Sequence, residues 1–178
     1  RSEMPHHPSV PVVRPHHAIA QRDRARAECV AGARALQRGD VNTAPDRFAR
    51  ATEAAAEDVD IALMHGVALR DAGRLADAQR ELIRAIGLDP SRHISYTHLA
   101  QAYRLAGDTQ QAASAALSAA RLQPKDPLAW RDAAESLRTA RQIEAALHAA
   151  FHAFALAPLD SSIANVVALL LHRCGRVN

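Results

Sequence analysis

The sequence predicts an all-α protein, an α-solenoid built from consecutive helix pairs, and three observations support this fold class. Proline returns every 34 residues, at Pro90, Pro124 and Pro158, and each proline closes a stretch of apolar helical pattern. Small residues recur with the same period. The sequence also lacks the alternating pattern of strands, and its 48% hydrophobic but only 3% aromatic residues suit thin, closely stacked helices.

The small residues form three series that keep the 34-residue register. These are Gly32, Gly66, Ala100, Ala134 and Ala168; then Ala44, Ala78, Ala112 and Ala146; then Ala51, Ala85, Ala119 and Ala153. Larger residues such as Phe48 and Leu82 fall between them on the same helical faces. Since two helices approach closely only where the side chains at their crossing are small, each series predicts one recurring helix contact.

Turn residues repeat in the same register, as Gly39, Gly73, Gly107, Arg141 and Gly175. With the prolines and small residues, this pattern resembles the tetratricopeptide repeat family, whose unit is a helix, a short turn and an antiparallel second helix. The resemblance covers residues 25–178. It implies a right-handed solenoid of about four units with a further helix at the end.

The expected elements follow in chain order. Residues 1–15 hold Pro5, Pro8, Pro11 and Pro15 and predict a flexible Pro/His-rich arm, with a first helix beginning near His17. Four repeats fill residues 16–160, at about 25–58, 59–92, 93–126 and 127–160, and residues 161–178 form a terminal solvating helix. Asp126 and Pro127 suit an N-cap and the first helical position. Arg141 departs from the turn glycines, so the fourth turn fits the pattern least.

Composition and charge argue against several classes of function. The 22 Lys and Arg residues exceed the 19 Asp and Glu residues by three, a balance too mild for nucleic-acid binding. We find no glycine-rich phosphate loop, nucleophile elbow or paired-cysteine motif, so we expect neither an enzyme nor a cofactor. No apolar run is long enough to span a membrane.

Cys29 and Cys174 lie in the first and last helices of the predicted stack. A disulfide requires Cα atoms within about 7 Å, so the two cannot pair within one molecule. A reducing cytoplasm is therefore favoured slightly, although the sequence does not determine the compartment.

Histidines suggest metal binding at two places, but we expect no metal at either. The arm repeats Pro-His-His without acidic or cysteine companions, and ordering it would cost much entropy. Glu144, His148 and His152 share one helical stripe on an outer surface that lacks an obvious fourth ligand. His65 falls within the packing series and is expected to be a core histidine with one satisfied nitrogen.

The resemblance implies that the first helix of each unit lines a concave groove, where a protein or peptide partner binds. The groove residues expected on this basis are Leu63, Met64, Val67, Arg70, Thr97, His98, Gln101, Arg104, Arg131, Glu135, Arg138, Asn165 and His172. They change from apolar to polar along the chain. This gradient suits a segment with one hydrophobic and one polar end.

Arg70, Arg104 and Arg138 are spaced by 34 residues, with His172 at the next step, and should form a row along the groove. Such a row favours an acidic ligand through charge-assisted hydrogen bonds. An alternative remains open, because an arginine near a helix C-terminus also complements the helix dipole.

The sequence thus predicts a scaffold or adaptor that binds a peptide or protein segment. Two alternatives stay open: the N-terminal recognition module of a longer bacterial enzyme, such as a transferase or hydroxylase, and a secretion-type chaperone. Leu169, Leu170 and Leu171 give the last helix an apolar side. We expect a homodimer contact or a further domain to cover that side.

Overall fold

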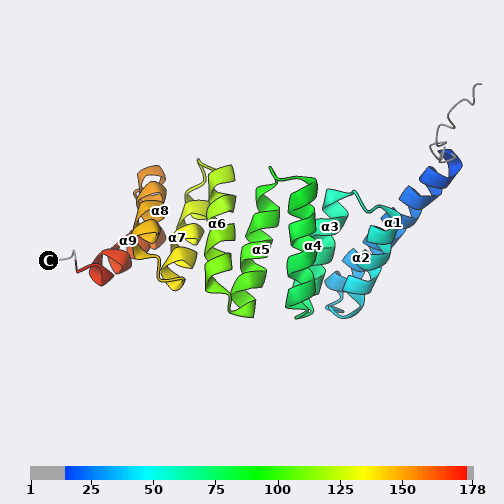
Figure 1. The fold of residues 1–178 in the computed structure, drawn as a ribbon, viewed down its shortest axis with the longest axis horizontal. Helices are drawn as coiled ribbons and strands as arrows, with labels where there is room; N and C mark the ends of the chain where they lie inside the picture. Colours follow the sequence, from blue (N-terminus) through cyan, green and yellow to red (C-terminus); the bar gives the residue numbers. More distant parts are fainter. Residues whose placement is uncertain (1–14, 176–178) are drawn as a thin grey trace, which may run out of the picture.

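The computed structural model describes residues 15–175, which form nine α-helices and no strand. The helices are α1 (Pro15–Gln37), α2 (Thr43–Ala54), α3 (Val59–Asp71), α4 (Leu75–Leu88), α5 (His93–Ala106), α6 (Thr109–Leu122), α7 (Pro127–Thr139), α8 (Ile143–Leu156) and α9 (Ser161–Arg173). They form an elongated row, with α1 at one end and α9 at the other (Figure 1).

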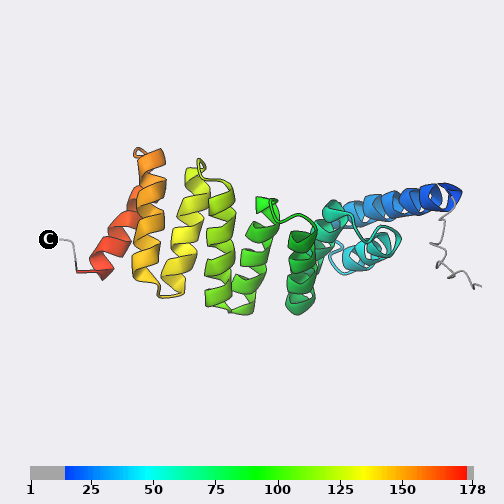
Figure 2. The same ribbon diagram turned by 45° about the horizontal axis from the view of Figure 1, so that its top comes forward.

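The row consists of helix pairs. Helix α1 packs against α2, α3 against α4, α5 against α6 and α7 against α8, and the second helix of each pair also contacts the next helix along the chain. The two helices of a pair run in opposite directions and are joined by a short turn (Figures 1 and 2). The fold class predicted from the sequence is therefore confirmed as an α-solenoid of antiparallel helix pairs.

The small residues lie where the helices of a pair cross. Gly32, Gly66, Ala100 and Ala134 are all buried, as are the alanine series that begin at Ala44 and Ala51. A Cβ atom added at Gly66 would lie 2.7 Å from Cγ of Leu82, and one added at Gly32 would lie 2.8 Å from Cε2 of Phe48. Glycine is therefore needed at these two crossings, because the facing side chain occupies the space that a Cβ would take.

The turns inside the pairs adopt one backbone conformation. Gly39, Gly73 and Gly107 have positive φ, as does Gly175 after α9, and Arg141 takes the same place in the fourth pair with φ of 60°. Among the described residues, Arg141 is the only one with positive φ that is not a glycine. The fourth turn therefore has an arginine in place of glycine but keeps the same backbone conformation.

Helix ends follow the expected chemistry. The carboxylates of Asp58, Asp126 and Asp160 accept hydrogen bonds from main-chain N–H groups in the first turns of α3, α7 and α9. Such caps satisfy donors that lack a partner inside the helix. Pro90, Pro124 and Pro158 each follow soon after the last residue of α4, α6 or α8, because proline cannot continue the hydrogen-bond ladder.

The first helix begins earlier than expected. We placed its start near His17 and the first repeat at residue 25, but α1 begins at Pro15 and extends beyond the end of α2 (Figure 1). Proline is tolerated in the first turn of a helix, where its missing N–H would have no intrahelical partner. The predicted arm otherwise lies outside the described residues.

The exposed side of α9 differs in part from the prediction. Leu170 is fully buried, so it does not contribute to an uncovered apolar side, whereas Leu169 is 56% exposed. Ala168 is also exposed, although the equivalent residues in the four preceding pairs are buried. The reason is that no second helix follows α9 within the described residues.

Candidate functional site

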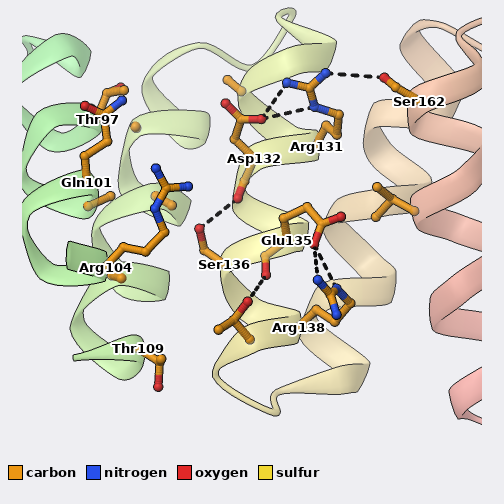
Figure 3. A pocket seen from close by; sticks show the side chains of 17 residues that line it. Thr97, Gln101, Arg104, Thr109, Arg131, Asp132, Glu135, Ser136, Arg138 and Ser162 are labelled. Carbon is orange, nitrogen blue, oxygen red and sulfur yellow. Dashed lines mark hydrogen bonds and ion pairs between the residues drawn. The ribbon is translucent and has the colours of Figure 1, made fainter. Parts of the chain in front are cut away.

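A cavity of about 640 Å³ opens between α5 and α7 and reaches α6 and α9. We call it the α5–α7 pocket. Its walls carry the polar residues Thr97, Gln101, Arg104, Thr109, Arg131, Asp132, Glu135, Ser136, Arg138, Thr139 and Ser162 (Figure 3). The other lining residues are Ala100, Ala112, Ala116, Ala119, Ala129 and Val166, so the pocket combines an apolar floor with charged walls.

The floor is formed largely by α6, whose buried residues are all alanines. In the two preceding pairs, a large side chain occupies the place that Ala116 takes in the third. Phe48 packs against Gly32 and Leu82 against Gly66, while Ala116 and the facing Ala100 both line the pocket. Small residues on both sides of this crossing leave room that Leu82 fills one pair earlier.

Two of the arginines in the pocket form ion pairs with acidic residues of α7. Arg131 donates to the carboxylate of Asp132 at 2.8 Å and to the hydroxyl of Ser162 at 3.3 Å. Arg138 lies 2.7 Å from a carboxylate oxygen of Glu135. These pairs satisfy both carboxylates of the wall (Figure 3).

Arg104 differs from these two arginines. Its side chain is exposed and points from α5 into the space in front of α7 (Figure 3). Within residues 18–175 it forms neither an ion pair nor a hydrogen bond. The pocket therefore presents an uncompensated guanidinium group, which favours an anionic ligand group.

Arg70, one repeat earlier, bridges two helices instead. Its Nη1 atom lies 2.8 Å from Nδ1 of His98 and also donates to Oε1 of Gln101, both on α5. Its other nitrogens donate to Asp71, and the side chain is only 14% exposed. Burial lowers the pKa of His98, with the nearby Arg70 charge acting in the same direction, so the neutral imidazole can accept the bond.

The predicted groove residues separate into two groups. Thr97, Gln101, Arg104, Arg131, Glu135 and Arg138 line the α5–α7 pocket. The others lie outside it: Leu63, Met64, Val67, Arg70, His98, Asn165 and His172. Asn165 and His172 are exposed on α9, and Met64 is exposed on α3.

Leu63, which the sequence places in the groove, is largely covered by other side chains. Its side chain is only 9% exposed and belongs to the main hydrophobic core, against which Val67 is also packed. A residue that the core already holds offers little surface to a partner.

The alanine floor was missed among the site residues expected from the sequence. The sequence does contain a pattern that indicates the floor. In the 34-residue register Ala116 faces Ala100, whereas the two earlier pairs have a glycine facing a large residue. A small residue facing another small residue leaves unfilled volume unless a neighbour occupies it.

Among the described residues, no group of three or more His, Cys, Asp and Glu side chains could hold a metal ion. His148 and Glu144 are exposed, and the ring of His152 stacks on that of Trp130 with a centroid distance of 4.2 Å. The Nδ1 atom of His65 lies 3.4 Å from a carboxylate oxygen of Glu81, too far for a good hydrogen bond, and is buried without another partner. Burial lowers the pKa of His65, opposed by the charge of Glu81.

Residues 63–127 match the family model described as tetratricopeptide repeat. This segment of the chain carries the tetratricopeptide repeat pattern. The match spans α4, α5 and α6, together with most of α3, and ends where α7 begins. The α5–α7 pocket thus combines repeat residues inside the matched segment with others beyond it.

Solved structures share the repeat architecture over nearly the whole chain. A crystal structure of MamA protein has a TM-score of 0.73 and 18% identity, covering 92% of this chain and 85% of that chain. MamA 41-end from Desulfovibrio magneticus RS-1 has a TM-score of 0.74 and 17% identity, covering 86% of this chain and 87% of that chain. At these identities the likeness concerns the fold.

No curated protein matches the repeat chain at a significant level. In the part of the chain that the structure describes, no helix has both the length and the apolar character required to cross a membrane.

Proposed function

We propose that this tetratricopeptide repeat chain is a protein-interaction scaffold that binds a segment of its partner along the groove lined by α3, α5, α7 and α9. The observation that carries the proposal is the α5–α7 pocket, an apolar-floored cavity of about 640 Å³ with the unpaired Arg104 at its wall. Cavities that combine apolar surface with a few convergent polar groups are the usual form of a ligand site.

Binding without catalysis is the role that we assign to this pocket. Three of its hydroxyl groups donate to main-chain carbonyls: Thr97 to that of His93, Ser136 to that of Asp132 and Thr139 to that of Glu135. The hydroxyl of Ser162 donates to the carboxylate of Asp160, the N-cap of α9, at 2.6 Å. A nucleophilic hydroxyl is usually activated by a histidine that accepts its proton, and the residues that line the pocket include no histidine. The arrangement supports a surface that holds a partner.

Site-specific photocrosslinking in the native host tests the proposal. A photoreactive residue at Ser136, in the pocket, should trap a partner protein, whereas one at Ser114 should not, because Ser114 is exposed on α6 away from the pocket floor. Equal crosslinking from both positions would contradict a groove site. The absence of any crosslinked protein from Ser136 would contradict the scaffold function.

A further inference from the structure

We propose that the α5–α7 pocket takes an apolar side chain of a peptide segment, with an adjacent Asp or Glu of that segment paired to Arg104. This inference rests on the scaffold function proposed above and specifies the chemistry of its ligand. Three features of the pocket carry it: the empty space over α6, the free guanidinium of Arg104, and the charge balance of the walls.

The space over α6 is suited to an aliphatic side chain. Ala116 replaces the leucine that fills the second pair, where Leu82 is fully buried against Gly66. The floor consists of methyl groups from Ala100, Ala112, Ala116 and Ala119, none of which can form a hydrogen bond. An aliphatic side chain of the ligand would restore the contacts that a leucine makes one repeat earlier.

Arg104 is free because its potential partners are already engaged. In the preceding repeat, Arg70 bonds His98 and Gln101. Their equivalents 34 residues later are Asp132 and Glu135, which pair with Arg131 and Arg138. The same arginine position therefore closes the groove between α3 and α5 but leaves it open between α5 and α7.

The charge of the walls matches a single carboxylate. The pocket contains three arginines and two acidic residues, and the ion pairs of α7 leave one positive charge uncompensated. A carboxylate can accept two parallel hydrogen bonds from a guanidinium group. A phosphate, with a second negative charge, would face Asp132 and Glu135 and is disfavoured by like-charge repulsion.

The test begins with the selection of a displayed library of random peptides on the full chain. Binding of the enriched peptides is then measured by fluorescence anisotropy with two variants. The double variant Ala100→Gly/Ala116→Leu copies the Gly66–Leu82 crossing and fills the pocket, and Arg104→Gln removes the charge. The matched controls are Ser114→Leu and Arg121→Gln, both at exposed positions on α6 outside the pocket.

We expect the enriched peptides to carry Asp or Glu beside Leu, Ile, Val or Met. Filling the pocket and removing the Arg104 charge should each weaken binding roughly tenfold or more, and the controls should leave it unchanged. Replacing the peptide's acidic residue by its amide should weaken binding to the wild-type chain but have no further effect with Arg104→Gln. This loss of coupling would assign the carboxylate to Arg104.

Two results would overturn the inference while leaving the scaffold function intact: enriched peptides that bind the filled variant with unchanged affinity, or peptides without an acidic preference. Enrichment of phosphopeptides from a phosphorylated library, in preference to acidic ones, would also overturn it. Failure of both the selection and the Ser136 crosslink would contradict the inference and the proposed function together. If circular dichroism shows that the filled variant does not fold, the exposed Arg104→Gln variant still decides the outcome.

Discussion

Gly66 of α3 lies against Leu82 of α4 so closely that a Cβ atom at position 66 would be 2.7 Å from Cγ of the leucine and 3.3 Å from its main-chain nitrogen. The flexible end of Leu82 cannot relieve the contact fully, because Leu82 is completely buried. The crossing of the second pair therefore depends on the missing side chain of Gly66.

Gly66→Ala is expected to lower the free energy of unfolding by about 1–3 kcal/mol through overpacking, as measured by urea denaturation. Gly87→Ala is the matched control, since Gly87 also lies within a helix but its Cβ would meet nothing within 4 Å. That control should raise the free energy of unfolding by about 0.5–1 kcal/mol. Equal stability of the two variants would contradict the crossing described here.

The turn at Arg141 allows a stabilising substitution. Arg141 has φ of 60°, a conformation that costs an L-residue with a side chain about 1–2 kcal/mol. Arg141→Gly should therefore raise the free energy of unfolding by about 1 kcal/mol, measured by chemical denaturation.

The equivalent turn in the third pair provides the reverse experiment. Gly107 has φ of 82° and open space around its Cβ position, so Gly107→Ala changes backbone strain without causing a clash. It should lower the free energy of unfolding by about 1 kcal/mol. A destabilised Arg141→Gly variant would show that the arginine side chain stabilises the turn by more than its backbone conformation costs.

The N-cap of α3 is expected to contribute measurably. The carboxylate of Asp58 accepts hydrogen bonds from the main-chain N–H groups of Asp60 at 2.9 Å and Ile61 at 3.1 Å. Asp58→Ala should lower the free energy of unfolding by about 0.5–2 kcal/mol. Asp58→Asn should keep most of the stabilisation that the cap provides, because asparagine is also a good N-cap residue. The comparison is Asn42→Ala, because Asn42 precedes α2 without a hydrogen bond from its side chain to the helix. A similar loss for Asp58→Asn and Asp58→Ala would argue against the cap.

Stability should fall as the pH falls below about 6.5, the usual pKa of an unfolded histidine. Burial lowers the pKa of both His65 and His98, so the unfolded chain binds protons that the folded chain excludes. Their contribution is complete above the unfolded pKa and is lost as the pH falls through the lower folded pKa. The lowered carboxylate pKa values act only at more acidic pH.

Urea midpoints at pH 7.5 and pH 5.5 measure this dependence. His98→Gln keeps a hydrogen-bond acceptor for Arg70 and should reduce the difference between the urea midpoints at the two pH values. His148→Gln, at an exposed position, should leave that difference unchanged. An unchanged drop in His98→Gln would show that His98 does not titrate as described.

The 34-residue register was sufficient to predict the order of the helices and the crossing residues, because those depend on contacts within a pair that repeat along the chain. Gly66, Ala78 and Ala85 are buried as the register requires. The register was not sufficient to predict that the side chains of Leu63 and Leu170 are buried. Whether these side chains are covered depends on neighbouring helices whose shapes the register does not specify.

The arginine row shows the same difference. Arg70, Arg104 and Arg138 are equivalent in sequence, but the residues that face them differ. Arg70 meets neutral acceptors on α5, whereas the acidic residues at the equivalent places on α7 are engaged by other arginines. The repeat of the backbone places the three arginines at equivalent positions. The side chains around each arginine, on its own helix or on the next repeat, decide whether it stays available to a ligand.

Each helix packs chiefly against the next helix or the next but one along the chain. Loss of packing at one place therefore need not unfold the other repeats at the same time. The outer helices α1 and α9 each lack neighbours on one side among the described residues, so opening should begin there and spread inward. Amide hydrogen exchange should accordingly be fastest in α1 and α9 and slowest in α4 to α6. Uniform protection along the chain would instead show that the repeats melt as one cooperative unit.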